Sequence, residues 1–338
     1  MRNISYQNDD VPKTFASYLV RFNPDEDIVL PEYLAAFLSS KQGVWDIKRR
    51  ARQSINQTNV NPEEVKEIFI PILPVDFQKE IQKRYIDANK KRVLSLSLYR
   101  QVEQLLLKTI GFNDFKSVKK NKNIKNLKES FFTTGRLDAE YYLPKYEDYL
   151  QLIKNYPNGF DKLQNVCILK DSNYNPDETK EYQYIELSDI GKSGNITGCI
   201  VAKGKELPSR ARRKVQTNDV IISSIEGSSE SCALVTNEFN HALCSTGFYV
   251  INSSIINSET LLVLFKSEVI QQIIKQNCSG TILTAINKSD FLHIPVPLID
   301  CQTQRQIAAL IEESFTLRQA SERLLQEAKE LVEREIEK

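Results

Sequence analysis

Apolar residues recur at every third or fourth position in two long stretches of the chain, and neither stretch contains glycine or proline. The first runs from Gln78 to Ile110 and the second from Gln304 to Lys338. This spacing places one apolar stripe along an α-helix. At a rise of about 1.5 Å per residue, each helix would be about 50 Å long. The pattern therefore predicts two long amphipathic helices.

Each predicted helix follows a closely similar segment. The sequence "FIPILPVDFQKEIQ" (69–82) resembles "HIPVPLIDCQTQRQI" (293–307). Each proline turn is preceded by a helix-like apolar run, "PEYLAAFLSSKQGVWDIKRRA" before the first turn and "SETLLVLFKSEVIQQIIKQ" before the second. A short polar stretch lies between each run and its turn. The chain thus contains an internal repeat of helix, polar loop, short strand, proline turn and long helix.

A shift of 226 residues superimposes the apolar stripes of the two long helices. A lone helix of this length cannot bury such a stripe, so we expect the helices to pair in antiparallel orientation. The alternative is that each helix packs on its own domain. The expected seam consists of Ile81, Leu98, Val102, Leu105, Ile307, Leu324, Ala328 and Leu331. Four small residues would let the backbones approach closely: Ala88, Ser95, Ser314 and Ser321.

The segment between the repeats mixes strand and helix signals. The stretches "YQYIELSDI", "DVIISSI" and "GFYVI" are β-branched and aromatic, as strands are, and "DAEYYLPKYEDYLQLIKN" has a helical pattern. The predicted fold class is therefore α+β. We expect a first partial domain at 1–76, a helix at 77–111, a Lys- and Asn-rich linker at 112–135, a complete domain at 136–300 and a helix at 301–338.

The linker is expected to be exposed, and its alternative role is that of an arm that touches phosphates. It contains Lys116, Lys119, Lys120, Lys122, Lys125 and Lys128.

Composition indicates a folded globular protein, with 41% hydrophobic and 26% charged residues. The net charge is only +1, so binding to nucleic acid would depend on local basic patches. The sequence contains no signal-peptide pattern and no membrane span, which favours the cytoplasm and no membrane partner. Six scattered cysteines and two histidines form no C-x-x-C pair, so we expect reduced thiols and no metal site.

No motif in the chain supports catalysis. Methyl transfer would require a glycine-rich cofactor turn and an Asn/Asp-Pro-Pro-aromatic loop, and neither occurs. "NPDETK" (175–180) resembles part of a metal nuclease site, but Asp177 and Glu178 are adjacent, whereas such a site needs carboxylates that are presented separately. With two histidines, no Ser/His/Asp or Cys/His arrangement is persuasive. We expect a binding protein.

The strongest binding signal is "KGKELPSRARRKV" (203–215), since arginine forks suit phosphate oxygens and the guanine edge. Its candidate DNA-binding residues are Lys203, Lys205, Arg210, Arg212, Arg213 and Lys214. Hydroxyls and backbone amides suited to phosphates come from Ser223, Ser224, Ser279, Gly280 and Thr281. A second candidate is "KRRARQS" (48–54), with Arg49, Arg50 and Arg52. Charge runs are more often solvated faces, which is the alternative for both.

The order of these features resembles the specificity (S) subunit of type I restriction-modification systems. The resemblance rests on the two "IP…P…Q" turns that open long helices, on "GRLDAEYYLPKY" (135–146) and on "SRARRKVQTNDVIISSIEG" (209–227). It implies that 136–300 is a target recognition domain and that 1–76 is the C-terminal part of another. It also implies that the two helices form an antiparallel coiled coil that holds the domains apart on a bipartite DNA site.

The same resemblance implies a non-catalytic adaptor whose partners are double-stranded DNA, methyltransferase (M) subunits and, through the complex, restriction (R) subunits. No cofactor is expected in this chain, and S-adenosylmethionine, ATP and Mg are expected in the partner subunits alone. One departure is that nothing before Ile70 matches "YIELSDI" or "SRARRKV", so the first domain would be truncated or completed by another chain. Two alternatives remain, a helical scaffold that does not bind DNA and a self-contained modifying enzyme.

Overall fold

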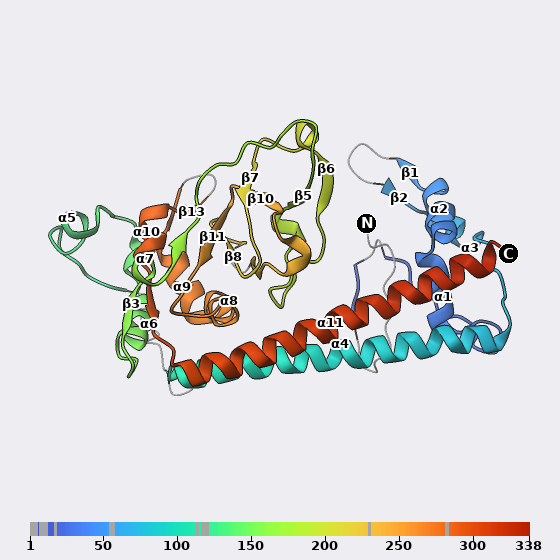
Figure 1. Cartoon of the computed structure of the whole chain (residues 1–338), viewed down its shortest axis with the longest axis horizontal. Coiled ribbons are helices and arrows are strands. Elements are labelled where there is room, and N and C mark those ends of the chain that lie inside the picture. Colours follow the sequence, from blue (N-terminus) through green and yellow to red (C-terminus); the bar gives the residue numbers. More distant parts are fainter. Residues whose placement is uncertain are drawn as a thin grey trace. The chain divides into compact units, whose positions relative to one another are not determined.

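The chain forms two compact units, and Figure 1 shows its helices and strands. Unit 1 combines residues 1–95 with 314–338, and unit 2 contains residues 96–313. The computed structural model describes residues 6, 13–16, 19–53, 58–112, 115, 122–228, 231–280 and 284–338.

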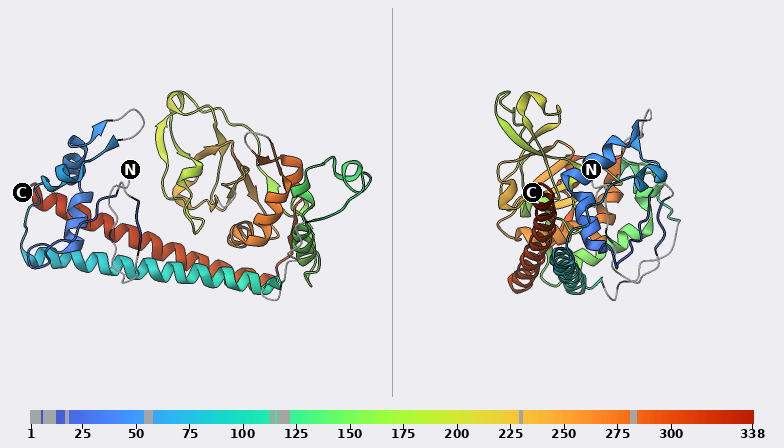
Figure 2. Two further views of the ribbon diagram at one scale, coloured as in Figure 1. Left: turned by 180° about the vertical axis from the view of Figure 1, so that it is seen from behind. Right: turned by 90° about the vertical axis from the view of Figure 1, so that its right-hand side faces the viewer.

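The two long helices are α4 (Val75–Thr109) and α11 (Cys301–Ile336). They run side by side in opposite directions, as Figures 1 and 2 show. Hydrogen bonds establish the direction, because Ser314 contacts Ser95 whereas Ser321, further along α11, contacts Ala88, which lies earlier in α4. The prediction of an α+β fold with two long antiparallel helices is confirmed. Each unit contains one half of the pair.

The helix seam consists of residues at heptad spacing. Those with at most 3% exposure are Ile81, Ala88, Ser95 and Val102 on α4 and Ile307, Ser314, Ser321 and Ala328 on α11. Of the other expected seam residues, Leu98 is buried, while Leu105, Leu324 and Leu331 are half-buried. The sequence interpretation missed three fully buried neighbours, Leu106, Ile311 and Val332. Small side chains occupy the middle of the seam, where the two backbones come close enough for hydroxyl-to-carbonyl hydrogen bonds.

The helical part of unit 1 begins with α1 (Pro31–Ser39) and α2 (Lys41–Arg49). The single apolar run of the sequence is thus divided into two helices at Ser40, whose hydroxyl accepts a hydrogen bond from the Gly43 amide and caps α2. Gly43 is required there, since a Cβ would lie 2.3 Å from the Phe37 carbonyl oxygen. The hairpin of β1 (Arg52–Gln53) and β2 (Thr58–Asn59) and helix α3 (Pro62–Lys66) follow.

Unit 2 repeats this order. The corresponding elements are α8 (Ser258–Lys266), α9 (Glu268–Asn277), β12 (Cys278–Ser279), β13 (Ala285–Ile286) and α10 (Lys288–Leu292), followed by β14 (Pro295–Pro297). In both units a polar N-cap side chain, Ser40 or Ser267, separates the first two helices. The internal repeat of the sequence is therefore a structural repeat, and α4 and α11 are equivalent helices within it.

The rest of unit 2 contains the sheets. Among the described residues, one four-stranded sheet has the order β6-β5-β10-β7 and another the order β4-β11-β8-β9. Their strands are β4 (Ile168–Leu169), β5 (Glu181–Ile185), β6 (Ile200–Lys203), β7 (Ala211–Lys214), β8 (Val220–Ser223), β9 (Cys232–Leu234), β10 (Leu243–Ser245) and β11 (Phe248–Asn252). The pairing is antiparallel except for β5 with β10. The core between them includes Ile185, Ile221, Phe248 and Val250.

Short helices precede the sheets. They are α5 (Phe131–Thr134), the 3-10 helix η2 (Ala139–Tyr142), α6 (Pro144–Lys154) and α7 (Leu163–Val166), with strand β3 (Phe160–Lys162) between the last two. In the predicted linker, Lys116, Lys119 and Lys120 lie outside the described residues. Lys122, Lys125 and Lys128 are exposed, and Lys125 forms an ion pair with Glu147 at 2.8 Å.

The described helices include none that is long and apolar enough to cross a membrane.

Candidate nucleic-acid interface

The basic segment 203–214 lies on strands β6 and β7 and on the loop between them. Strand β7 pairs with β10, and the buried Ala211 and Val215 anchor its two ends. The 3-10 helix η4 (Gly204–Glu206) starts the loop. A Cβ at Gly204 would lie 2.1 Å from the Asp177 carbonyl oxygen, so glycine allows this loop to lie against the loop at 174–180. The segment thus runs from β6, at one edge of the sheet, to β7, at the other edge.

Arg210 is held in place by two residues, Tyr184 on β5 and Glu186 directly after β5. Its Nη2 atom donates to Glu186 Oε1 at 2.9 Å, and its Nε atom donates to the Tyr184 hydroxyl at 3.2 Å. The hydrogen bond to the Glu186 carboxylate raises the pKa of the guanidinium. The Arg210 side chain still exposes 59% of its surface. The guanidinium is therefore oriented and also accessible.

Arg212 and Lys214 interact with the loop at 174–180. Arg212 donates to the Ser209 carbonyl at 3.0 Å and to the Asn175 side chain. The Lys214 amine lies 5.2 Å from the centre of the Tyr174 ring, in a cation-π contact. Tyr174 and Asn175 belong to the sequence "NYNP", which the sequence interpretation did not select as a DNA contact. An aromatic residue between two asparagines in a loop was the signal that could have identified them.

Arg213 differs from its neighbours, because consecutive side chains of a strand alternate between its two faces. Its Nη1 atom is buried and has no hydrogen-bond partner among the described residues. The positive charge helps to lower the pKa of Asp171, after the larger effect of the hydrogen bond from Lys288. Arg213 thus interacts with the interior of unit 2, in contrast to the expectation that it lies on the binding surface with the other arginines.

Lys203 and Lys205 are exposed, and neither amine has a partner among the described side chains. The backbone around them is fixed by hydrogen bonds from Gly204 to the Lys180 carbonyl and from Lys205 to the Glu178 carbonyl, at 2.9 and 3.3 Å. Two free ammonium groups therefore project from an ordered loop.

The serine candidates divide into buried and exposed groups. Ser223 has no exposed surface, and its hydroxyl bonds Ser228 at 2.9 Å, so the structure contradicts its expected place on the surface. Ser224 is half-buried and donates to the Gly247 carbonyl at 3.0 Å. Ser279 and Gly280 are exposed at the β12–β13 hairpin, while Thr281 lies outside the described residues.

The turn at 246–247 brings several of these segments together. The Thr246 amide donates to the Arg210 carbonyl, and the Ser224 amide donates to the Gly247 carbonyl, each at 2.9 Å. The β12–β13 hairpin adjoins the same segment, because Ile225 bridges Ala285. Arg210, Ser224 and Ser279 therefore lie on neighbouring segments, although they are far apart in the sequence.

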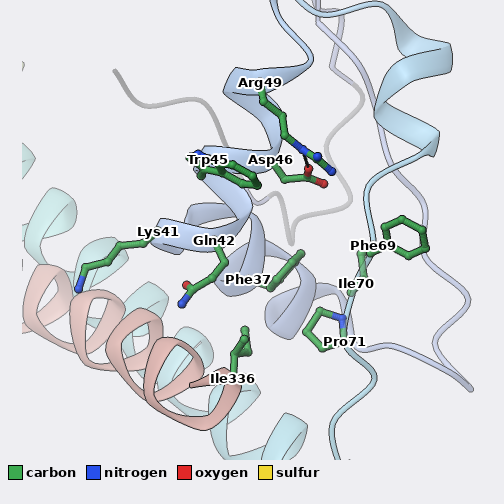
Figure 3. Close-up of a pocket in the computed structure, with 10 residues that line it drawn as sticks. All are labelled: Phe37, Lys41, Gln42, Trp45, Asp46, Arg49, Phe69, Ile70, Pro71 and Ile336. Carbon is green, nitrogen blue, oxygen red and sulfur yellow. Dashed lines mark hydrogen bonds and ion pairs between the residues drawn. The ribbon is translucent and has the colours of Figure 1, made fainter. Parts of the chain in front are cut away.

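The second basic candidate, in unit 1, is largely committed to internal contacts (Figure 3). Arg49 forms an ion pair with Asp46 and stacks 5.0 Å from the Trp45 ring centre. Arg50 donates to the Glu67 carbonyl at 2.6 Å, and its side chain is only 18% exposed. Arg52 lies on β1, and its side chain is outside the described part of the structure. The contacts of Arg49 and Arg50 favour a structural role over a DNA contact.

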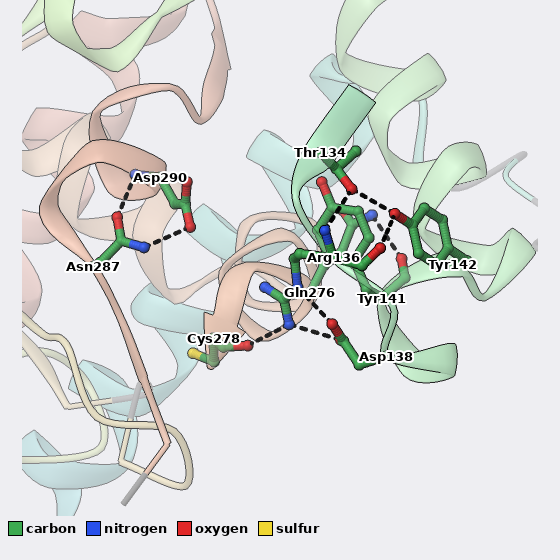
Figure 4. A network of polar contacts seen from close by, with 9 residues as sticks. All are labelled: Thr134, Arg136, Asp138, Tyr141, Tyr142, Gln276, Cys278, Asn287 and Asp290. Carbon is green, nitrogen blue, oxygen red and sulfur yellow. Dashed lines mark hydrogen bonds and ion pairs between the residues drawn. The ribbon is translucent and has the colours of Figure 1, made fainter. Parts of the chain in front are cut away.

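The motif "GRLDAEYY" forms a polar network that attaches η2 to α9 and β12 (Figure 4). Arg136 donates to both carboxylate oxygens of Asp138 at 2.8 and 2.7 Å and to the Cys278 carbonyl at 3.0 Å. Its guanidinium lies 4.5 Å from the Tyr141 ring centre. Gln276 donates to the Tyr141 carbonyl at 3.1 Å. This motif therefore fixes the start of the domain to the hairpin that carries Ser279.

The described residues contain no cluster of His, Cys, Asp and Glu that could hold a metal ion. The cysteines are free thiols, and all except Cys199 and Cys301 are buried.

Comparison with known proteins gives one family. The family model described as "Type I restriction modification DNA specificity domain" matches residues 161–330, about half of the chain. A search of curated proteins finds no match.

Solved structures similar to this chain come from the same kind of system. One, titled as the structural basis of complex assembly and conformational transition of the type I R-M system, is 27% identical over 46% of this chain and 42% of its own, with a TM-score of 0.42. The HsdS subunit from Thermoanaerobacter tengcongensis is 27% identical over 48% and 44%, with a TM-score of 0.40. The type I S subunit from M. genitalium is 16% identical over 91% and 71%, also with a TM-score of 0.40. The chain thus spans less than half of the length of the first two structures.

Proposed function

The chain belongs to the type I restriction modification DNA specificity domain family, and from this premise we propose that it reads duplex DNA through unit 2 as the recognition subunit of a type I complex. The observation that carries this proposal is the accessible Arg210 guanidinium, which Glu186 and Tyr184 hold in one orientation. A guanidinium fork matches the O6 and N7 acceptors of guanine in the major groove.

Different cations on this surface have different proposed roles. An arginine that is already oriented loses little side-chain entropy on binding, so Arg210 is suited to reading a base. Lys203 and Lys205 are free ammonium groups on an ordered loop, so they are suited to phosphates. Arg212, Lys214, Ser224, Ser279 and Gly280 are proposed to support the DNA backbone from neighbouring segments.

The ion pair with Glu186 also limits the electrostatic contribution of Arg210. Because the carboxylate offsets one positive charge, this surface attracts DNA weakly through its net charge, and the chain as a whole has a net charge of only +1. The fixed orientation of Arg210 therefore contributes more to sequence selectivity than to binding affinity. Non-specific binding, in contrast, depends on contacts with phosphates.

The adaptor role is part of the proposal. M subunits would bind the chain, R subunits would join through them, and S-adenosylmethionine, ATP and Mg would be held by those partners. The chain itself would be non-catalytic. A direct test is capture of the M subunit that belongs with this chain by the full-length protein, and failure of capture at micromolar concentrations would contradict the adaptor role.

DNA recognition is tested by selection of the full chain on random duplexes. We expect an enriched motif, and we expect Arg210→Ala to reduce binding to that motif by about 1–3 kcal/mol and to relax the preference at one position. Arg323→Ala is the matched control, because this arginine is exposed on α11 in unit 1. Binding that is absent or independent of salt would support the alternative of a helical scaffold that does not bind DNA.

A further inference from the structure

Unit 1 has an open apolar groove of about 730 Å³ between α2 and the segment 69–71 (Figure 3). Trp45 and Phe69 line it and expose 64% and 84% of their surface. Ile336 at the end of α11 also lines the groove, and Lys41 and Arg49 lie at its rim. Large aromatic side chains with this exposure, on two segments that line one groove, indicate a surface that another molecule covers.

The structural repeat shows what covers the equivalent surface in unit 2. There, α9 is the equivalent of α2, and β14 is the equivalent of the segment 69–71. Helix α6 packs against both α9 and β14, and β3 pairs with β14 in antiparallel register. The equivalent of Ile336 in this repeat is Ile110, which is buried with 3% exposure. The helix-strand segment Pro144–Lys162 thus fills this surface in unit 2.

Individual contacts support the equivalence. An offset of 227 residues, from Pro31 to Ser258, aligns the helices of the two units. It aligns three groove residues with three residues of α9 that bind the segment 141–149: Lys41 with Glu268, Trp45 with Gln272, and Arg49 with Gln276. Glu268 accepts from the Tyr149 hydroxyl at 2.9 Å, Lys145 donates to Gln272 at 3.3 Å, and Gln276 donates to the Tyr141 carbonyl at 3.1 Å.

The backbone beside the groove contains an unpaired residue, next to Pro71, whose carbonyl accepts a hydrogen bond from the Tyr33 hydroxyl at 2.6 Å. In unit 2, Val296 of β14 lies opposite Asp161 of β3. Its equivalent in unit 1 is Ile70, and among the described residues no hydrogen bond is formed by the backbone of Ile70. An extended segment with an unpaired backbone residue, beside an exposed apolar surface, is suited to the addition of a strand from another chain.

We propose that this groove docks an amphipathic helix followed by a short strand, supplied by a second polypeptide and built like Pro144–Lys162. The strand would pair with 69–71, and the helix would cover Trp45 and Phe69. The charges at the rim identify the partner further. Unit 2 presents Glu268 and Gln276 at positions where the groove presents Lys41 and Arg49, so the partner helix carries an acidic side chain opposite Lys41.

The segment Pro144–Lys162 of a second copy is a poorer occupant for two reasons. It is already packed in its own unit, so its exchange would leave an equal surface exposed there. It also places Tyr149, which is not acidic, opposite Lys41. DNA is a poorer occupant as well, since the lining is mainly apolar and includes two cations, Lys41 and Arg49, at its rim. This proposal does not depend on DNA recognition by unit 2.

The test uses the full chain and the fluorescence of Trp45, which is the single tryptophan of the sequence. The probe is a synthetic peptide of residues 144–162 that carries Tyr149→Glu, which places a carboxylate opposite Lys41. We expect a saturable blue shift of the emission, because the peptide removes water from the indole. A peptide with Tyr149→Lys should bind more weakly, and a scrambled peptide should give no shift.

Variants of the chain separate docking from non-specific adsorption. Phe69→Ala should weaken binding of the Glu peptide at least about fivefold, as loss of an aromatic anchor does. Phe132→Ala is the matched control, because Phe132 is 72% exposed in unit 2, and it should leave binding unchanged. Should Phe69→Ala not fold, Lys41→Glu provides a second test, since it should reverse the preference between the Glu and Lys peptides. Absence of a shift with either peptide, equal binding of the scrambled peptide, or a shift produced by duplex DNA alone would overturn the proposal.

Discussion

Gln78 and Gln304 form equivalent sets of hydrogen bonds at the start of the two long helices. In each case the side-chain amide donates to two backbone carbonyls, and the side-chain carbonyl accepts from the backbone at the start of a helix. For Gln78 the distances are 2.9 Å to Leu73, 3.4 Å to Ile28 and 2.8 Å from Leu30. For Gln304 they are 2.8 Å to Ile299, 3.1 Å to Ile255 and 2.8 Å from Asn257. The repeated glutamine therefore ties the proline turn to the first helix of each repeat.

Gln304→Glu should destabilise the chain by about 1–3 kcal/mol at neutral pH, because the buried carboxylate cannot donate to the Ile299 and Ile255 carbonyls. Burial without donors raises the pKa of this carboxyl in the folded state above its unfolded value of about 4.3. The folded variant then binds more protons than the unfolded one, so its deficit grows as pH rises above that value and shrinks on acidification. Urea unfolding between pH 4 and pH 8 measures this change.

The matched control is Gln302→Glu, at an exposed position two residues away on α11. It should change stability by less than about 0.5 kcal/mol. A similar deficit in both variants would show that Gln304 does not act through its buried hydrogen bonds.

Ser314→Leu should separate the two long helices. The Ser314 hydroxyl is fully buried and donates to the Ser95 carbonyl at 2.9 Å, so no space exists for a larger side chain. Overpacking of this kind costs about 1–3 kcal/mol. Thermal or urea unfolding checks the loss, and Thr316→Leu on the exposed face of α11 is the control. Equal stability of the two variants would contradict a close-packed seam.

The sequence predicted the long helices and their direction because period and repeat are local properties of the chain. The shared heptad positions, such as Ile81 and Ile307, indicated which face is buried. The exact set of buried residues was harder to predict, since Val332 is buried in a cluster with Tyr33 and Phe37 of α1. The division of the first helical run at Ser40 depends on a capping hydrogen bond, which the apolar pattern does not reveal.

Individual side chains of the candidate interface were predicted less well than the segment. The cluster of cations at 203–214 could be identified from composition, but the inward orientation of Arg213 and the ion pair of Arg210 with Glu186 depend on strand pairing over long sequence distances. Burial of Ser223 follows from its place on the central strand β8. The polar side chain of Ser223, taken alone, had indicated a position on the surface.

Lys203→Ala and Lys205→Ala should each weaken DNA binding on all sequences and should lower the slope of log K against log salt by about one unit. The reason is that each free ammonium group is expected to neutralise one phosphate. Titrations of the enriched duplex at several salt concentrations measure the slope. Lys154→Ala, at an exposed position on α6, is the control. An unchanged slope in both lysine variants would remove this loop from the interface.

Cys301 should be the thiol that reacts fastest with a disulfide reagent at pH 8, because it is exposed at the start of α11. Burial raises the pKa of Cys278 to about 11 and that of Cys167 to about 12, so these thiols contain little of the reactive thiolate. Cys301→Ser should remove the fast phase of labelling, whereas Cys278→Ser should retain it. A fast phase that persists in Cys301→Ser would show that a buried thiol is accessible in solution.

Asp138→Asn should weaken the network at the start of unit 2 in a manner that depends on pH. The hydrogen bond from Arg136 lowers the pKa of the Asp138 carboxyl below its usual value of 3.8. Because the folded pKa is lowered, the stabilisation is fully present above the unfolded value and is lost as pH falls through the folded value. The Asp138 side chain is 47% exposed, so the effect should be at most about 1 kcal/mol. Unfolding of the variant and of wild type should therefore differ at pH 6 and converge near pH 2, while Glu322→Gln on the exposed face of α11 should follow wild type throughout. A difference that persists at pH 2 would assign the loss to packing and not to the charge of Asp138.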